Sequence, residues 1–158
     1  MDESIVFNRY FNLSLRFLSY RPRSEKEVYD YFKEKSRKSS SLTEEIIAKI
    51  MQRLIDLKFI NDLEFTRFWI SNRNKALRIL KFELQQKGIA KEIIEATLLE
   101  FDYEEKENNL IQKLIEKKKK SLIKFEKRKA YEKMAAFLLR KGFNYDQIKK
   151  HLDKNVEF

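Results

Sequence analysis

The sequence predicts an all-α protein, on the evidence of its turn residues, its composition and an internal repeat. Only 2 of its 158 residues are glycine and 1 is proline, whereas a β-sheet protein needs such residues at its hairpins. Lys, Glu and Leu, which favour helices, are abundant throughout the chain. At this length the chain can also bury a substantial apolar core.

The two glycines lie in two copies of one pattern. The segment Leu84–Leu98 aligns with Leu138–Leu152 at an offset of 54 residues, which superposes Gly88 on Gly142. A glycine just past a helix end adopts the left-handed conformation at least cost, and the next residue packs back on the last turn. We therefore expect one helix to end at each glycine and another to begin soon after it. The expected contacts are Ile89 on Leu84 and Phe143 on Leu138.

Extended along the chain, this pattern gives three units of three helices. The expected helices span about 11–20, 25–36 and 43–58, then 62–74, 76–87 and 91–101, then 104–120, 126–141 and 145–154. One such unit buries too little apolar surface by itself, so neighbouring units must stack. The predicted fold is three tandem three-helix repeats forming an elongated, curved helical array. The repeats span 1–60, which includes an N-terminal extension, then 61–103 and 104–158.

The first repeat contains a chain break and a capping signal. Pro22 interrupts the helical pattern, and Ser24 followed by Glu27 predicts a capping box at the start of the second helix. Ser36 stands where the other repeats have glycine, and the insert SRKSSS that begins there is expected to form an exposed, flexible loop. The equivalent core positions of the three repeats are Val28 and Phe32, Leu80 and Leu84, and Met134 and Leu138.

Composition excludes several kinds of site. With no cysteine and one histidine, the chain has no disulfide or thiolate metal centre, and we expect no metal and no cofactor. His151 is expected at the surface of the last helix. A glycine-rich phosphate loop is missing, and the acidic residues stand at helix-surface spacing beside Lys or Arg, as ion pairs do. We therefore predict that the protein is not an enzyme.

The sequence also predicts where the protein works. No apolar run approaches the ~18 residues of a membrane-spanning helix. The first residues, MDESIVFNRYF, have acidic side chains where a signal peptide has Lys or Arg. Together with the lack of cysteine, these features predict a cytoplasmic protein with no membrane partner. We further expect a monomer.

Positive charge is concentrated in the last third of the chain. The net charge is +10, and residues 104–158 carry 16 basic and 9 acidic side chains. A polyanion or an acidic protein surface is the natural partner. Much of this charge lies in the tract EKKKKSLIKFEKRK, which is either a solvated helix end complementing the helix dipole or a surface that faces the partner. A smaller cluster around residues 73–78 could join it, although a generic solvated surface is the stronger interpretation there. The candidate binding residues are Lys117, Lys118, Lys119, Lys120, Lys124, Lys127, Arg128 and Lys129 in the tract, and Arg73, Lys75 and Arg78 in the smaller cluster.

The run KFINDLEFTRFWISNR is rich in aromatic rings. Asn61 is a good N-cap, with Glu64 placed to complete a capping box. Phe65, Phe68 and Trp69 follow at helical spacing, which places their rings on one face. The preferred interpretation is core packing between the first and second repeats, because a base-stacking surface would need exposed rings. The residues assigned structural roles are Asn61, Phe65, Phe68, Trp69, Gly88 and Gly142.

Four segments together resemble the RecX family of regulatory proteins. They are the aromatic run FINDLEFTRFWISNR, the turn RPRSEKEV, and the two Lys-Gly endings in LQQKGI and LLRKGFNYDQI. Each is weakly specific alone, but their order and spacing are typical of the family over about Leu13 to Asp153. The chain departs from the family pattern at Lys58, where a glycine usually precedes the aromatic pair, and in the SRKSSS insert.

The resemblance implies a fold of three tandem three-helix repeats and a non-catalytic function. A RecX protein modulates the bacterial recombinase RecA. The protein would bind the RecA–single-stranded-DNA filament and restrain filament growth, ATP turnover and strand exchange. Two alternatives stay open at this stage. The chain could be a stand-alone protein that binds duplex DNA through a helix-turn-helix-like unit. It could also be a helical adaptor that binds another acidic protein through its basic tract.

Overall fold

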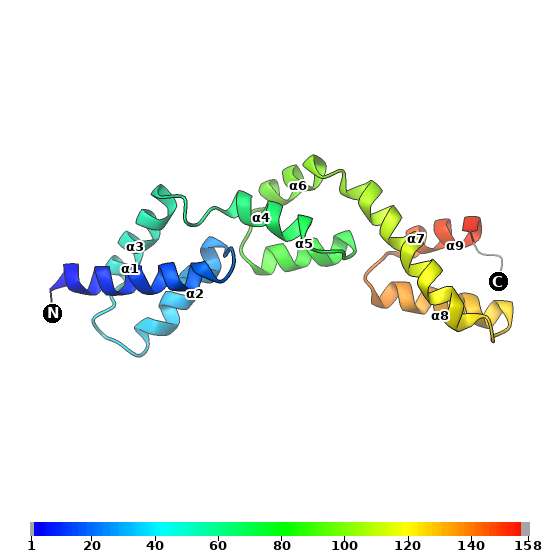
Figure 1. The fold of residues 1–158 in the computed structure, drawn as a ribbon, viewed down its shortest axis with the longest axis horizontal. Helices are drawn as coiled ribbons and strands as arrows, with labels where there is room; N and C mark the ends of the chain where they lie inside the picture. The colour runs from blue at the N-terminus through cyan, green and yellow to red at the C-terminus, as the bar shows by residue number, and fades with distance from the viewer. Residues whose placement is uncertain (1, 156–158) are drawn as a thin grey trace. The chain divides into compact units, whose positions relative to one another are not determined.

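The computed structural model describes the backbone of residues 2–155 and the side chains of residues 2–153. All regular structure in this part of the chain is helical, which confirms the predicted all-α class (Figure 1). The helices are α1 (Glu3–Ser19), α2 (Glu25–Ser36), α3 (Glu44–Asp56), α4 (Asp62–Ser71), α5 (Leu77–Gln86), α6 (Lys91–Glu100), α7 (Tyr103–Leu122), α8 (Lys127–Arg140) and α9 (Tyr145–Asn155).

The chain folds into two compact units, which we describe separately. The first unit comprises the chain up to Ser71 together with Leu84–Thr97, and the second comprises Asn72–Glu83 together with the chain from Leu98 on. In the first unit α3 packs against α1 and α2, and in the second α8 packs against α7 and α9. The six residues predicted at core positions are confirmed as core, since all are fully buried: Val28, Phe32, Leu80, Leu84, Met134 and Leu138.

The first helix was predicted too short, because α1 begins at Glu3 rather than near residue 11. Asp2 is its N-cap and accepts a hydrogen bond from the Ser4 N–H at 3.0 Å. Val6 and Tyr10 are buried in the core of the first unit, so the segment before residue 11 contributes to that core. The two apolar residues stand four apart on one helical face, a spacing that the sequence does show.

The aromatic run is only partly buried. Phe65 and Trp69 are buried as predicted, with ring centroids 5.3 Å apart. The prediction for Phe68 was wrong, because its side chain is 37% exposed, and Phe59 is 51% exposed. A ten-residue helix that buries Phe65, Trp69 and Ile70 turns the position of Phe68 toward the edge of that face.

The predicted N-cap of α4 is confirmed. The Asn61 side chain accepts hydrogen bonds from the N–H groups of Leu63 and Glu64, at 3.0 and 3.1 Å. The Glu64 carboxylate, which was expected to complete the capping box, pairs with Arg67 at 2.6 Å. The start of the helix is therefore fixed by one polar side chain that the sequence identifies directly.

Three helices end with the same backbone hydrogen bond, which is donated by the residue that follows one in the left-handed conformation. After α5, Gly88 has φ +79° and the Ile89 N–H donates to the Leu84 carbonyl at 3.1 Å. After α8, Gly142 has φ +97° and the Phe143 N–H donates to the Leu138 carbonyl at 3.3 Å. Both predicted glycine endings are thus confirmed. The third ending follows α3, where Lys58 has φ +58° and the Phe59 N–H donates to the Leu54 carbonyl at 2.9 Å.

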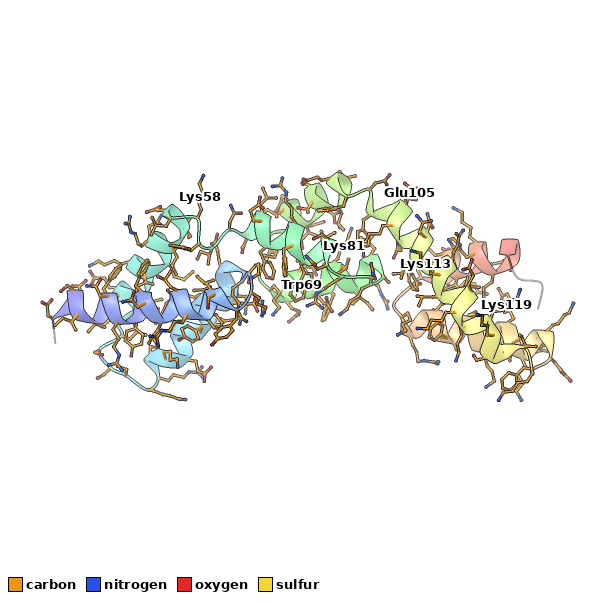
Figure 2. All side chains as sticks on the ribbon, in the orientation of Figure 1. Lys58, Trp69, Lys81, Glu105, Lys113 and Lys119 are labelled. Carbon is orange, nitrogen blue, oxygen red and sulfur yellow. The ribbon has the colours of Figure 1, made fainter. Side chains whose placement is uncertain are left out.

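Replacing Lys58 by glycine is expected to raise the free energy of unfolding by about 0.5–1 kcal/mol. The left-handed conformation costs an L-residue roughly 1–2 kcal/mol, and the greater freedom of glycine in the unfolded chain takes back part of this gain. The Lys58 side chain points away from the fold in Figure 2, so its removal breaks no core contact. Urea denaturation measures the change. Lys58→Ala is the control: it keeps the strained Cβ, and an equal gain in both variants would contradict a conformational cause.

The N-terminus of α2 joins distant parts of the first unit. The predicted capping box is present: the Ser24 hydroxyl accepts from the Glu27 N–H, and the Glu27 carboxylate accepts from the Ser24 N–H, both at 3.2 Å. The same hydroxyl donates to the Lys87 carbonyl, at the end of α5, at 2.7 Å. Asp62 at the start of α4 accepts from the Glu25 N–H at 2.8 Å. Two helices distant in sequence are therefore attached to one helix end.

Glu27 is the charged centre of this junction. Its carboxylate lies 2.6 Å from the Arg21 guanidinium, 2.7 Å from the Lys87 ammonium and 3.9 Å from Arg23. Burial alone would raise the pKa of Glu27, but the hydrogen bonds from Arg21, Lys87 and the Ser24 N–H outweigh it and lower the pKa to about 2. The junction is therefore stabilised by an ionised carboxylate at neutral pH.

The second unit contains a comparable buried carboxylate on α7. Glu107 is 3% exposed, and its two oxygens accept from the Leu77 N–H at 2.7 Å and from the Gln147 amide at 2.8 Å. The Tyr103 hydroxyl donates to the Lys75 carbonyl at 2.8 Å, and burial raises the pKa of Tyr103 to about 12. Side chains of α7 thus hold the start of α5, and through Gln147 the start of α9, within this unit.

His151 was predicted at the surface and is buried, with 7% of its area exposed. Its Nε2 lies 3.0 Å from the Asn108 side-chain oxygen on α7. The neighbouring Leu152 is buried too, so α9 turns both residues toward the core of the second unit. One polar partner across the unit is enough to satisfy a buried ring nitrogen, and the sequence around residue 151 carries no sign of it.

Candidate polyanion-binding surface

The basic tract crosses three structural elements of the second unit. Lys117 to Lys120 lie in the last turns of α7, Lys124 lies in the connection that follows, and Lys127 to Lys129 form the first turn of α8. Figure 2 marks Lys113 and Lys119 on α7. The tract was predicted as one candidate surface. Because it reverses direction between two packed helices, its side chains divide between a groove and the outer faces of the helices.

The groove lies where the end of α7, the connection and α8 meet, and we call it the Phe125 groove. It has a volume of about 660 Å³. Its lining includes five cations and one carboxylate, Glu132, beside an apolar floor that contains Leu122, Phe125 and Ala136. Glu132 pairs with Arg128 at 3.2 Å, so part of its charge is already neutralised. The five cations are Lys118, Lys124, Lys129, Lys133 and Arg140.

Three lysines gather around the ring of Phe125. Their ammonium nitrogens lie 5.4 Å (Lys124), 5.7 Å (Lys129) and 4.8 Å (Lys133) from the ring centroid. A cation is attracted to the face of an aromatic ring, so these contacts hold mutually repelling charges in one place. Lys118 makes the same kind of contact with Phe137, at 5.6 Å. The aromatic residues therefore concentrate positive charge at the groove.

The other predicted residues of the tract do not line this groove. Lys117, Lys120 and Lys127 are exposed, as is Arg128, which is paired with Glu132. Lys119 is half-buried on α7. The structure thus brings together three of the eight predicted tract residues and separates them from five: Lys117, Lys119, Lys120, Lys127 and Arg128.

The smaller predicted cluster does not join the groove. Lys75 pairs with Glu83 and lines a separate hollow of about 280 Å³, which Arg140 and Lys141 also line. Arg78 is exposed on α5, and Arg73 is half-buried in the segment before that helix. Arg140 lines both this hollow and the Phe125 groove. Lys75 is therefore the member of the smaller cluster that shares a hollow with a groove residue.

Lys133 and Arg140 were not among the predicted residues, although the sequence carries a signal for both. Residues 129, 133, 136 and 140 are spaced by four, three and four, so they share one face of α8. The prediction followed the density of lysines in the sequence. Applying the helical period to α8 would have separated the residues that line the groove from those that face outward.

In the part of the chain that the structure describes, no helix has the length and apolar character needed to span a bilayer.

Comparison with protein families relates this arrangement to known proteins. The family model described as the first three-helix domain of RecX matches residues 11–54. The model of the third three-helix domain of RecX matches residues 104–152, which include the Phe125 groove. The chain belongs to the RecX family. The matches confirm the predicted three-helix organisation at both ends of the chain, and the family that the sequence motifs indicated.

Curated relatives carry the name regulatory protein RecX. That of Bacillus subtilis is 36% identical over 151 residues, a match that covers 91% of this chain and 54% of the relative. That of Oceanobacillus iheyensis is 32% identical and covers 91% of this chain and 52% of the relative. That of Clostridium tetani is 33% identical and covers 89% of this chain and 64% of the relative. The chain therefore spans about half to two thirds of the length of these RecX proteins.

Solved RecX structures share the fold. The crystal structure of RecX from Lactobacillus salivarius matches with a TM-score of 0.77 at 28% identity, over 94% of this chain and 95% of that one. A second crystal structure of a regulatory protein RecX matches with a TM-score of 0.78 at 23% identity, over 94% of this chain and 73% of that one. The helical fold described above is thus the fold of RecX proteins.

Proposed function

We propose that this RecX family member is a non-enzymatic regulator that binds the RecA–single-stranded-DNA filament. Binding restrains filament extension, ATP hydrolysis and strand exchange in DNA recombination and repair. The protein acts in the cytoplasm as a monomer. The observation that carries the proposal is membership of a family of regulatory proteins, supported by matches to the family's domains at both ends of the chain.

The charge of the Phe125 groove supports the proposal that the partner carries phosphates. Five cations line it and its one carboxylate is already paired, which gives the second unit a strongly positive recess. A filament of RecA on single-stranded DNA combines a protein surface with a phosphate backbone. Phosphate neutralisation releases counterions, so binding through this recess weakens steeply with rising salt.

The proposal predicts that the protein slows the DNA-dependent ATPase of RecA when it is present at less than one copy per RecA. A regulator that restrains filament growth acts on many subunits from one position, so inhibition does not need saturation. Steady-state ATP hydrolysis on single-stranded DNA measures the effect. Hydrolysis at the full rate, with the protein shown to be bound in excess, would contradict the proposal.

Co-sedimentation separates this function from the two alternatives. The protein is mixed with RecA filaments, with duplex DNA or with free RecA, and each mixture is centrifuged. We expect recovery with the filaments. Tight, sequence-selective binding to duplex DNA without RecA would favour a stand-alone DNA-binding protein. Binding to neither RecA nor DNA would leave an adaptor for another acidic protein.

A further inference from the structure

We propose that the Phe125 groove binds a segment of single-stranded nucleic acid directly, without the help of RecA. The inference rests on the proposed function for its biological setting, and it adds the ligand class and the residues of one contact site. The phosphates lie against the cations of the two helices, and the apolar floor contacts a sugar or base. The residues assigned to phosphate contact are Lys118, Lys124, Lys129, Lys133 and Arg140.

The charge of the groove is unbalanced. Some basic side chains elsewhere on the molecule meet a carboxylate, as Lys33 meets Glu44 and Lys49 meets Glu3. In the groove, five cations share one carboxylate, Glu132, which pairs with Arg128 on the same helix. Bringing like charges together costs free energy that an anionic ligand recovers. A ligand with several regularly spaced negative charges recovers the largest part of this free energy.

An aromatic ring lies within the cluster of charges. Sites for single strands typically combine a positive groove, which follows the backbone, with an aromatic side chain on which a base can rest. Phe125 is half-buried, lines the groove and is surrounded by three ammonium groups within 6 Å of its centroid. Leu122 and Ala136 extend the apolar floor on both helices. An anion alone would need no such floor.

The kind of cation in the groove determines how tightly it fixes a phosphate. Four of the five are lysines, whose ammonium groups bind phosphate as point charges, without the fixed geometry that the fork of arginine imposes. A lysine groove holds a phosphate backbone in several registers. We therefore expect binding with little preference among base sequences.

The test compares two variants that lose the same charge in different places. The groove variant carries Lys124→Gln, Lys129→Gln and Lys133→Gln. The control variant carries Lys117→Gln, Lys120→Gln and Lys127→Gln, all exposed positions that do not line the groove. Each variant loses three charges from the net +10, so nonspecific attraction falls equally. The probe is a fluorescently labelled oligothymidylate, and anisotropy without RecA measures its affinity at several salt concentrations.

We expect the groove variant to bind the oligonucleotide ~10- to 100-fold more weakly, and its salt slope to fall by about 2, since each lost contact with a single strand contributes ~0.7. The control variant should lose less than ~3-fold in affinity. Equal losses in both variants, or no binding by the unmodified protein, would overturn the inference. The inference would also be overturned if polyglutamate displaced the oligonucleotide as effectively as unlabelled oligonucleotide does. The same holds if the groove bound duplex DNA with the same affinity as the single strand.

Two further measurements keep the result interpretable. A variant with Lys124→Arg, Lys129→Arg and Lys133→Arg keeps the charges and should bind like the unmodified protein, which shows that charge at these positions decides the loss. Circular dichroism confirms that each variant is helical; if the glutamine variant does not fold, Lys133→Gln alone replaces it, with Lys127→Gln as its control. The RecA ATPase assay on the same proteins is an independent measurement. If the protein inhibits the ATPase but its oligonucleotide binding does not depend on the groove, this inference is wrong and the proposed function stands. If oligonucleotide binding depends on the groove but the protein does not inhibit the ATPase, the inference stands and the proposed function is wrong.

Discussion

Replacing Trp69 by alanine is expected to lower the free energy of unfolding by ~3–5 kcal/mol, the range for large buried aromatic residues. The side chain is buried, its ring lies 5.3 Å from that of Phe65, and the Lys87 ammonium lies 5.5 Å from its centroid. Alanine removes these contacts and leaves a cavity where the indole ring lies. Urea denaturation followed by circular dichroism measures the loss, because the variant has no tryptophan left to report by fluorescence.

Phe68→Ala is the matched control for this variant. Phe68 precedes Trp69 directly and is 37% exposed, so its truncation should cost less than ~1 kcal/mol. If the two variants lost the same stability, burial would not be the cause. If Trp69→Ala lost filament binding with an unchanged melting temperature, the ring would face the partner and not the core.

Replacing Glu27 by glutamine is expected to lower the free energy of unfolding by about 2–4 kcal/mol, since a neutral amide leaves partly buried cations without their counter-charge. Arg21 and Lys87 both point at this carboxylate, at 2.6 and 2.7 Å. Glutamine keeps the size of the side chain and an oxygen for the Ser24 N–H, so the loss reports on charge. Unfolding is followed by the fluorescence of Trp69, which lies in the same unit.

The same residue gives the protein an acid-dependent stability. The pKa of Glu27 is lowered from its ordinary 4.5 to about 2 in the folded state. A carboxyl group with a lowered pKa contributes stability that is fully present above its unfolded pKa and is lost as pH falls through the folded value. The free energy of unfolding should therefore decline between about pH 4.5 and pH 2, and Glu27→Gln should remove that part of the decline. An identical pH profile in both proteins would contradict the assignment.

The local features of the fold could be predicted from the sequence because each has a local cause. Ser24 and Asn61 cap helices through their own side chains, and Gly88 and Gly142 end helices through their own backbone conformation. These signals placed most helices within a few residues of their observed ends. Lys58 shows the limit of residue type as a signal, since it takes the same left-handed conformation without being glycine.

The features that sequence analysis missed depend on distant parts of the chain. The burial of His151 depends on Asn108, and the buried Glu107 acts on the Leu77 N–H, 30 residues away. No local pattern specifies such pairs. The Phe125 groove is an intermediate case, because the positions on α8 follow the helical period but their meeting with Lys118 requires the reversal of the chain between α7 and α8. The density of lysines in the sequence therefore identified the region that contains the groove, but it also selected residues that do not line the groove.

The hydroxyl of Ser24 has a consequence for which residues this position can accept. It receives the Glu27 N–H and at the same time donates to the Lys87 carbonyl. At an ordinary helix start aspartate and serine are nearly interchangeable, since each needs only to accept a hydrogen bond. Here an ionised carboxylate could not donate and would face the carbonyl oxygen that ends α5 with like charge. Threonine can perform both tasks, so the substitutions tolerated at this helix start are narrower than capping preferences alone suggest, and they are dictated by a helix 63 residues away.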